Sequence, residues 1–181
     1  KVLDDRFLYP MDILKPLSEH ETGLWKEKKD QDKFKDYIAE LGVSDFGAGI
    51  KDAYSFGRVT QSGYVHVGKL LKKMHQFLKE KELLIDSHFD YKDLGFIGSQ
   101  ISWHGIVAET IVFCEGYHAA RNPYFGDVGF NPTKGELLEI HCEGLQEDFI
   151  LNKNLFVMPV GDYRFKVGAT YDWKNIDEEI T

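Results

Sequence analysis

The stretch LFVMPVGDYRFKVGAT (residues 155–170) indicates the fold more clearly than any other part of the chain. It holds two runs rich in β-branched and aromatic residues, Leu155–Met158 and Arg164–Ala169, and the second run alternates polar with apolar side chains. Such alternation is typical of half-buried strands. Gly161 and Asp162 lie between the runs and favour a turn. The stretch therefore predicts two successive strands with a turn between them.

Helical signals are confined to the first half of the chain. Ser18 and Glu21 have the capping-box spacing, in which each side chain takes an orphan backbone donor at a helix start. Apolar residues on one face predict a second helix over Asp32–Leu41, ended by Gly42. The strongest pattern follows Gly68, where apolar residues recur every three to four positions and lysines occupy the outer face. These apolar residues are Leu70, Leu71, Met74, Phe77 and Leu78.

The other apolar runs predict strands bounded by Gly, Asp, Asn and Pro. Because the helices cluster early and the strands late, we predict an α+β fold with a mixed, largely antiparallel sheet and a few helices. The remaining predicted strands are Tyr54–Val59, Tyr64–Val67, Leu83–Phe89, Ile106–Cys114 and Glu136–His141.

Length and composition limit the number of domains and argue against several classes of protein. With 181 residues, 43% of them hydrophobic and 29% charged, the chain is sufficient for one sizeable domain or two interleaved small ones. No run approaches the roughly 18 apolar residues of a membrane span, so we expect a soluble protein with no membrane partner. The net charge of −8 disfavours nucleic acid as a partner, because an acidic surface repels phosphates. Cys114 and Cys142 form no disulfide framework and are predicted to be reduced core residues of a cytoplasmic protein.

Complete motifs of common catalytic chemistries are missing from the sequence. The seven histidines lack the close pairs that zinc sites use, so no metal site is predicted. No GxSxG, GxGxxG or GxxxxGK[ST] occurs either, and no catalytic residue is assigned. Phe113–Gly116 is an apolar strand end followed by glycine, where a flat cofactor can approach the backbone. The same pattern fits an ordinary tight turn.

Five segments, taken in order, resemble the middle of flavin-dependent oxidoreductases of the D-amino-acid oxidase superfamily, in the branch of glycine oxidase and sarcosine oxidase. They cover most of the chain from Tyr54 to Trp173, and their order and spacing are more specific than any single motif. The resemblance implies the substrate-domain type of α+β fold. The segments are Thr60–Val65, Lys69–Lys81, Ile111–Gly116, Asn131–Glu136 and Arg164–Thr170.

The resemblance also implies a domain division and a reaction. Residues 1–67 and 123–181 would form a discontinuous substrate-binding domain, and residues 68–122 would return to the FAD domain. The family's GxGxxG would precede Lys1 and its carboxylate-clamping Arg would follow Thr181, so the chain is expected to be a fragment. The intact protein would be an FAD-dependent oxidoreductase that oxidises a small amine or amino acid by hydride transfer to flavin. The fragment alone is expected to be inactive and flavin-free.

Candidate cofactor residues follow from the same resemblance. Gly116, with Glu115 and Tyr117, would form the turn beside the flavin, and Phe89 would lie on a strand that passes its adenosine side.

The resemblance also implies candidate substrate residues, which are Phe156 and Asn154, on the strand before the Gly-Ala-Thr strand, together with Tyr64. Glycine oxidase has a tyrosine where Phe156 stands, so a hydroxyl donor is lost here. This difference favours a substrate larger or more apolar than glycine.

Two alternatives and one partner prediction remain open. The chain could be a non-catalytic, β-rich ligand-binding module that has lost flavin. Some members of the superfamily act on tRNA, but the acidic charge argues against that activity here. Residues 106–114 are expected to leave an open sheet edge, which would allow a homodimer to form.

Overall fold

The computed structural model describes residues 6–42 and 53–181, and the chain divides by its internal contacts into two compact units. The first, the sheet unit, includes the described residues 6–42, 53–77 and 135–171. The second, the aromatic unit, includes residues 78–134 and 172–179. No helix in the described ranges has the length and apolar character needed to cross a membrane.

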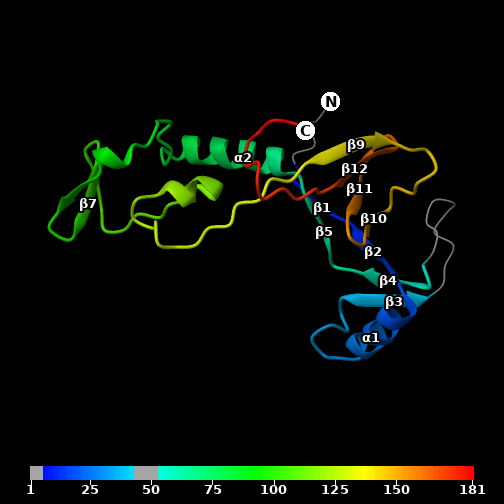
Figure 1. Ribbon diagram of the computed structural model, residues 1–181. Coiled ribbons are helices and arrows are strands. Elements are labelled where there is room, and N and C mark those ends of the chain that lie inside the picture. The colour runs from blue at the N-terminus through cyan, green and yellow to red at the C-terminus, as the bar shows by residue number, and fades with distance from the viewer. Residues whose placement is uncertain (1–5, 43–52) are drawn as a thin grey trace. The chain divides into compact units, whose positions relative to one another are not determined.

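The sheet unit is built on a seven-stranded sheet in the order β3-β4-β2-β10-β11-β12-β9 (Figure 1). The β2–β10 pair is parallel and the other neighbouring strands are antiparallel. The predicted α+β fold with a mixed, largely antiparallel sheet is therefore confirmed. The strands are β2 (Asp12–Leu17), β3 (Ile38–Gly42), β4 (Ser55–Val59), β9 (Leu137–His141), β10 (Phe149–Asn152), β11 (Phe156–Gly161) and β12 (Arg164–Gly168).

A two-stranded ribbon and most of one helix also belong to the sheet unit. Strand β1 (Leu8–Pro10) pairs antiparallel with β5 (Gly63–Val65). Helix α2 (Val67–Glu80) begins two residues after β5 and confirms the helix predicted after Gly68. Its apolar face is largely open within the described residues, where Leu71 is 63% exposed.

Helix α1 (Glu19–Lys29) packs against β2, β3 and β4 and begins at the predicted capping box. The backbone N–H of Ser18 donates to Glu21 Oε2 at 2.8 Å, and the N–H of Glu21 donates to Ser18 Oγ at 3.3 Å. The indole of Trp25 lies over Gly57, where an added Cβ would be 2.6 Å from the ring. Buried side chains on both faces of the sheet form the core. They are Leu14, Leu17, Ile38, Phe56, Phe149, Ile150 and Phe165.

The helix predicted over Asp32–Leu41 is wrong. Residues 31–37 form turns, and Ile38–Gly42 is strand β3, which pairs antiparallel with β4. Ile38 is only 6% exposed because it packs in the sheet. Gly42 therefore ends a strand rather than a helix. Pairing with β4 outweighs the three-to-four spacing of the apolar residues in this segment.

The aromatic unit contains a three-stranded antiparallel meander and a cluster of rings. The rings belong to Phe89, Tyr91, Trp103, Phe113 and Tyr124, and the centroids of contacting pairs lie 5.5–6.4 Å apart. The strands are β6 (Gly95–Ile97), β7 (Gln100–Trp103) and β8 (Ile106–Ala108), and two 3-10 helices cover Tyr91–Asp93 and Gly116–Arg121.

The strand predictions are confirmed in the sheet unit and largely wrong in the aromatic unit. In the sheet unit the predicted runs appear as β4, β5, β9, β11 and β12, although Val67 begins α2 instead of ending β5. In the aromatic unit the strand predicted over Leu83–Phe89 is wrong, and only Ile106–Ala108 of the Ile106–Cys114 run is a strand. These residues form no ladder with another described segment, and a strand needs a hydrogen-bonded neighbour. Both cysteines are free, but Cys114 is exposed and Cys142 is only partly buried, so neither is the core residue that was predicted.

Candidate functional site

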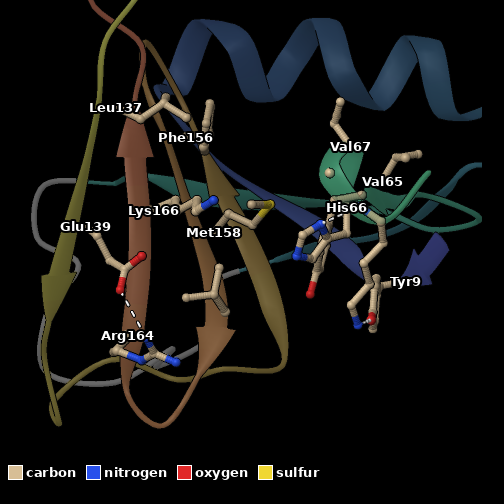
Figure 2. A pocket seen from close by; sticks show the side chains of 14 residues that line it. Tyr9, Val65, His66, Val67, Leu137, Glu139, Phe156, Met158, Arg164 and Lys166 are labelled. Atoms are coloured by element: carbon tan, nitrogen blue, oxygen red, sulfur yellow. Dashed lines mark hydrogen bonds and ion pairs between the residues drawn. The ribbon is translucent and has the colours of Figure 1, made fainter. Parts of the chain in front are cut away.

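A pocket of about 730 Å³ lies in the sheet unit, between two walls of side chains (Figure 2). One wall is the face of strands β9, β11 and β12. The other is formed by β1, β5 and the first turn of α2. All of its lining residues belong to the sheet unit, so this unit alone defines the pocket.

The sheet wall consists of two rows of residues, because strand pairing places them opposite one another. In the first row Phe156 lies opposite Gly168, and Gly168 lies opposite Leu137. Gly168 has no side chain, and Leu137 occupies that space, since an added Cβ would be 2.1 Å from Leu137 Cδ2. The second row is Met158, Lys166 and Glu139.

The charged groups of the sheet wall are unevenly paired. Arg164 NH1 donates to Glu139 Oε1 at 3.2 Å, and both side chains are about half exposed. The side-chain ammonium group of Lys166 makes no hydrogen bond or ion pair with any residue of the described ranges, although Lys166 lies between Met158 and Glu139 in the register.

Two stacked tyrosines dominate the opposite wall. The rings of Tyr9 and Tyr64 lie 5.0 Å apart and within 9° of parallel. Lys69 Nζ donates to the Tyr9 hydroxyl at 2.5 Å. Burial, followed by the neighbouring Tyr9, raises the pKa of Tyr64, and Lys69 opposes this shift. The Tyr64 phenol therefore stays protonated at neutral pH and is available as a hydrogen-bond donor.

The local backbone fixes this wall. Gly63 pairs with Pro10, and an added Cβ at Gly63 would lie 2.3 Å from the backbone oxygen of Tyr9. His66 Nδ1 accepts from the backbone N–H of Lys69 at 3.3 Å, so the imidazole caps the start of α2. Glycine at position 63 thus permits the close strand pairing that brings the two tyrosines together.

The structure brings two of the three predicted substrate residues to this pocket. Phe156 and Tyr64 line it from opposite walls. Asn154 lies in the exposed turn between β10 and β11 and does not line it. The sequence prediction did not include Met158, Lys166, Tyr9 or Lys69. Strand alternation from Phe156 would have found Met158, whereas Tyr9 required knowledge of the β1–β5 pairing.

The predicted cofactor residues lie in the aromatic unit. The carboxylate of Glu115 accepts from the hydroxyl of Tyr91 and, at 2.7 Å, from Nδ2 of Asn122. These bonds hold the pKa of Glu115 below its usual range and that of Tyr91 above it. Phe89 also contacts Tyr91, edge-on at 5.7 Å between ring centroids. The structure therefore places Phe89 and Glu115 around one phenol.

Gly116 and Tyr117 begin the 3-10 helix that follows Glu115. Gly116 has φ +56°, a conformation that favours glycine, and an added Cβ would meet no atom within 4 Å. The Tyr117 hydroxyl donates to Glu178 at 3.4 Å. Among the described residues, no three His, Cys, Asp or Glu side chains gather as metal ligands.

Comparison with known proteins gives one informative similarity. The crystal structure of glycine oxidase from Geobacillus kaustophilus matches the chain with a TM-score of 0.72 and 18% sequence identity. The match covers 96% of this chain and 51% of that chain, so this chain spans about half the length of that protein. No family model matches the sequence. The similarity shows a glycine oxidase-like fold.

Proposed function

We propose that the chain is the substrate-binding part of an FAD-dependent oxidoreductase that oxidises an amine or amino acid by hydride transfer to flavin. The observation that carries the proposal is the pocket in the sheet unit, lined by Phe156 and Tyr64, within a glycine oxidase-like fold. The match to about half of the glycine oxidase chain supports a further part of the protein that completes the flavin site.

In this proposal residues 1–67 and 123–181 form the substrate-binding domain and residues 68–122 belong to the FAD domain. The two units support a two-part chain, although the boundaries between them fall after Phe77, Lys134 and Tyr171. Residues 123–134 and 172–179 therefore group with the aromatic unit and residues 68–77 with the sheet unit, in contrast to the proposed boundaries.

The residues proposed to adjoin FAD fit a flat ring system. Gly116 leaves open space beside the backbone, and Glu115 and Tyr117 flank it. Phe89 adds an aromatic face in the same unit. FAD, when bound, supplies the acceptor for the hydride.

On the substrate side, the chain's own residues bind and orient the amine. Phe156 and Met158 offer an apolar surface, and the protonated Tyr64 phenol offers a hydrogen bond from the opposite wall. Orientation and exclusion of water are the contributions expected of such a wall.

The decisive experiment is expression of the chain together with the residues encoded upstream and downstream of it. The longer protein should be yellow, show a flavin absorption band, and oxidise amines. The 181-residue chain, supplied with FAD and glycine or sarcosine, should show no oxidase activity. A folded but colourless longer protein would contradict the proposal.

A second candidate is a ligand-binding module without flavin. The observation in its favour is that all the described residues lining the pocket belong to the sheet unit. The same experiment separates the two, because this candidate predicts a colourless longer protein that still binds small molecules.

The substitution Phe156→Tyr tests the proposed substrate wall in the flavin-loaded protein. A restored hydroxyl should improve kcat/KM for glycine by about tenfold relative to a larger amine, because one hydrogen bond to a charged group contributes roughly 1.5–3 kcal/mol. Asn154→Tyr is the matched control outside the pocket and should leave this ratio unchanged. Equal ratios in the Phe156→Tyr variant and the parent would contradict the assignment.

A further inference from the structure

The pocket carries more positive than negative charge, although the chain as a whole has a net charge of −8. Lys69, Arg164 and Lys166 line it, whereas Glu139 is its one carboxylate among the described residues. A cation excess in a concave surface raises the local concentration of anions. The composition of the wall therefore favours a negatively charged ligand.

The three cations differ in what they already contact. Lys69 donates to the Tyr9 hydroxyl. Arg164 bonds Glu139 at 3.2 Å and lies 3.9 Å from an oxygen of Asp162. Lys166 makes no such contact with any residue in the described part of the chain. Its ammonium group is thus the cation of the pocket that is available to a ligand.

The side chains next to Lys166 favour a ligand that also has an apolar part. Met158 lies directly opposite it on β11, and Phe156 follows two residues away on the same face of that strand. Figure 2 shows Lys166 and Met158 side by side, projecting from the sheet into the pocket. Glu139 is opposite Lys166 on β9, but its carboxylate bonds Arg164 instead. A ligand at this wall meets one ammonium group beside an apolar surface.

We propose that the pocket binds a carboxylate at the end of an apolar stem, with Lys166 pairing with the carboxylate and Phe156 and Met158 contacting the stem. As a statement about the substrate, this proposal rests on the proposed function. The substrate would be an amine whose acidic end group is separate from the carbon that reacts. The volume of about 730 Å³ accommodates such a ligand.

The test uses the 181-residue chain and three small probes. Hexanoate has the stem and the carboxylate, 1-hexanol has the stem alone, and acetate has the carboxylate alone. Binding is followed by ¹H–¹⁵N NMR titration. Hexanoate should bind about tenfold more tightly than either other probe, as one charge-assisted hydrogen bond predicts, and should shift the amides of β11 and β12.

The variant Lys166→Met should reduce the affinity for hexanoate to that for hexanol and leave hexanol binding unchanged. Lys166→Arg should retain most of the preference. Lys28→Met removes an exposed cation of α1 and serves as the matched control, which should behave like the parent chain. Equal affinities of the parent chain for hexanoate and hexanol, or full preference in Lys166→Met, would overturn the proposal.

A salt titration keeps the proposal testable if Lys166→Met fails to fold. Raising NaCl from about 50 to about 500 mM should weaken hexanoate binding severalfold and leave hexanol binding unchanged, because salt screens only the charged contact. An affinity for hexanoate that is insensitive to salt contradicts the role of Lys166. These measurements involve no flavin, so a colourless longer protein would refute the proposed function and leave this result standing.

Discussion

The two units of the chain organise apolar side chains in different ways. Every hydrophobic side chain that is fully buried among the described residues lies in the sheet unit, as Leu14 and Phe165 do at 1% exposure. In the aromatic unit the described residue that is fully buried is the polar Asn122, while the rings around it are partly open. The sheet unit therefore has a conventional core, and the aromatic unit is held by ring contacts and a polar network around Glu115.

This contrast shows what a strand-like sequence needs in order to form a strand. The run Arg164–Gly168 has neighbours on both sides, β11 and β9. The run Leu83–Phe89, also predicted as a strand, has no paired neighbour in the described ranges, and Leu83 and Ile85 are 69% and 60% exposed. Composition thus indicates strand capacity, and pairing determines whether the strand forms.

The largest expected effect is the loss of stability when one aromatic ring is removed, and we compare this loss between the two units. Phe165→Ala should lower the free energy of unfolding by about 3–5 kcal/mol, because it empties a fully buried site. Phe113→Ala in the aromatic unit should lower it by less than half as much, since its site is partly open to water. Urea denaturation followed by circular dichroism measures both. Equal losses would contradict the contrast between the two units.

A pair of glycines in the sheet unit tests how closely that core is packed. Gly57→Ala should destabilise the chain by about 1–3 kcal/mol, because the new Cβ would lie 2.6 Å from the Trp25 indole. Gly23→Ala in α1 is the matched control, since an added Cβ there meets no atom within 4 Å. It should stabilise the helix by up to about 1 kcal/mol. Thermal unfolding of both variants should give shifts of opposite sign, and two shifts of the same sign would refute the packing argument.

Whether a feature could be predicted from the sequence depends on how far apart along the chain the interacting residues lie. The start of α1 was predictable because Ser18 and Glu21 satisfy each other within four residues. Ile38–Gly42 was not, because its pairing with β4 is a contact between distant segments that outweighs a local helical spacing.

The residues of the candidate site also fall into two groups, those that the local sequence indicates and those that depend on contacts between distant segments. Phe156 was found through a resemblance in sequence, and Tyr64 was assigned to the same pocket. The stacking of Tyr9 on Tyr64 depends on a pairing between β1 and β5 that no local pattern reveals. Lys166 was visible as the polar member of an alternating strand. That its ammonium group has no partner among the described residues depends on the pairing of Glu139 with Arg164, which the sequence pattern does not reveal.

The smallest expected effect concerns acid and is confined to the aromatic unit. Hydrogen bonds from Tyr91 and then Asn122 lower the pKa of Glu115 in the folded state. A lowered folded pKa means that the ionised carboxylate stabilises the fold at pH values above its unfolded pKa of about 4.5. This contribution is lost as the pH falls through the folded value. The aromatic unit should therefore loosen below about pH 4.5.

The indole N–H resonance of Trp103, whose ring stacks on Phe89 at 5.5 Å, reports on this loosening. Glu115→Gln should weaken the unit slightly at neutral pH and make the Trp103 resonance much less sensitive to acid, because no charge remains to be neutralised. Asp127→Asn removes an exposed carboxylate of the same unit and should leave the acid response intact. An unchanged response in Glu115→Gln would show that ring contacts, and not the Glu115 network, hold this unit together.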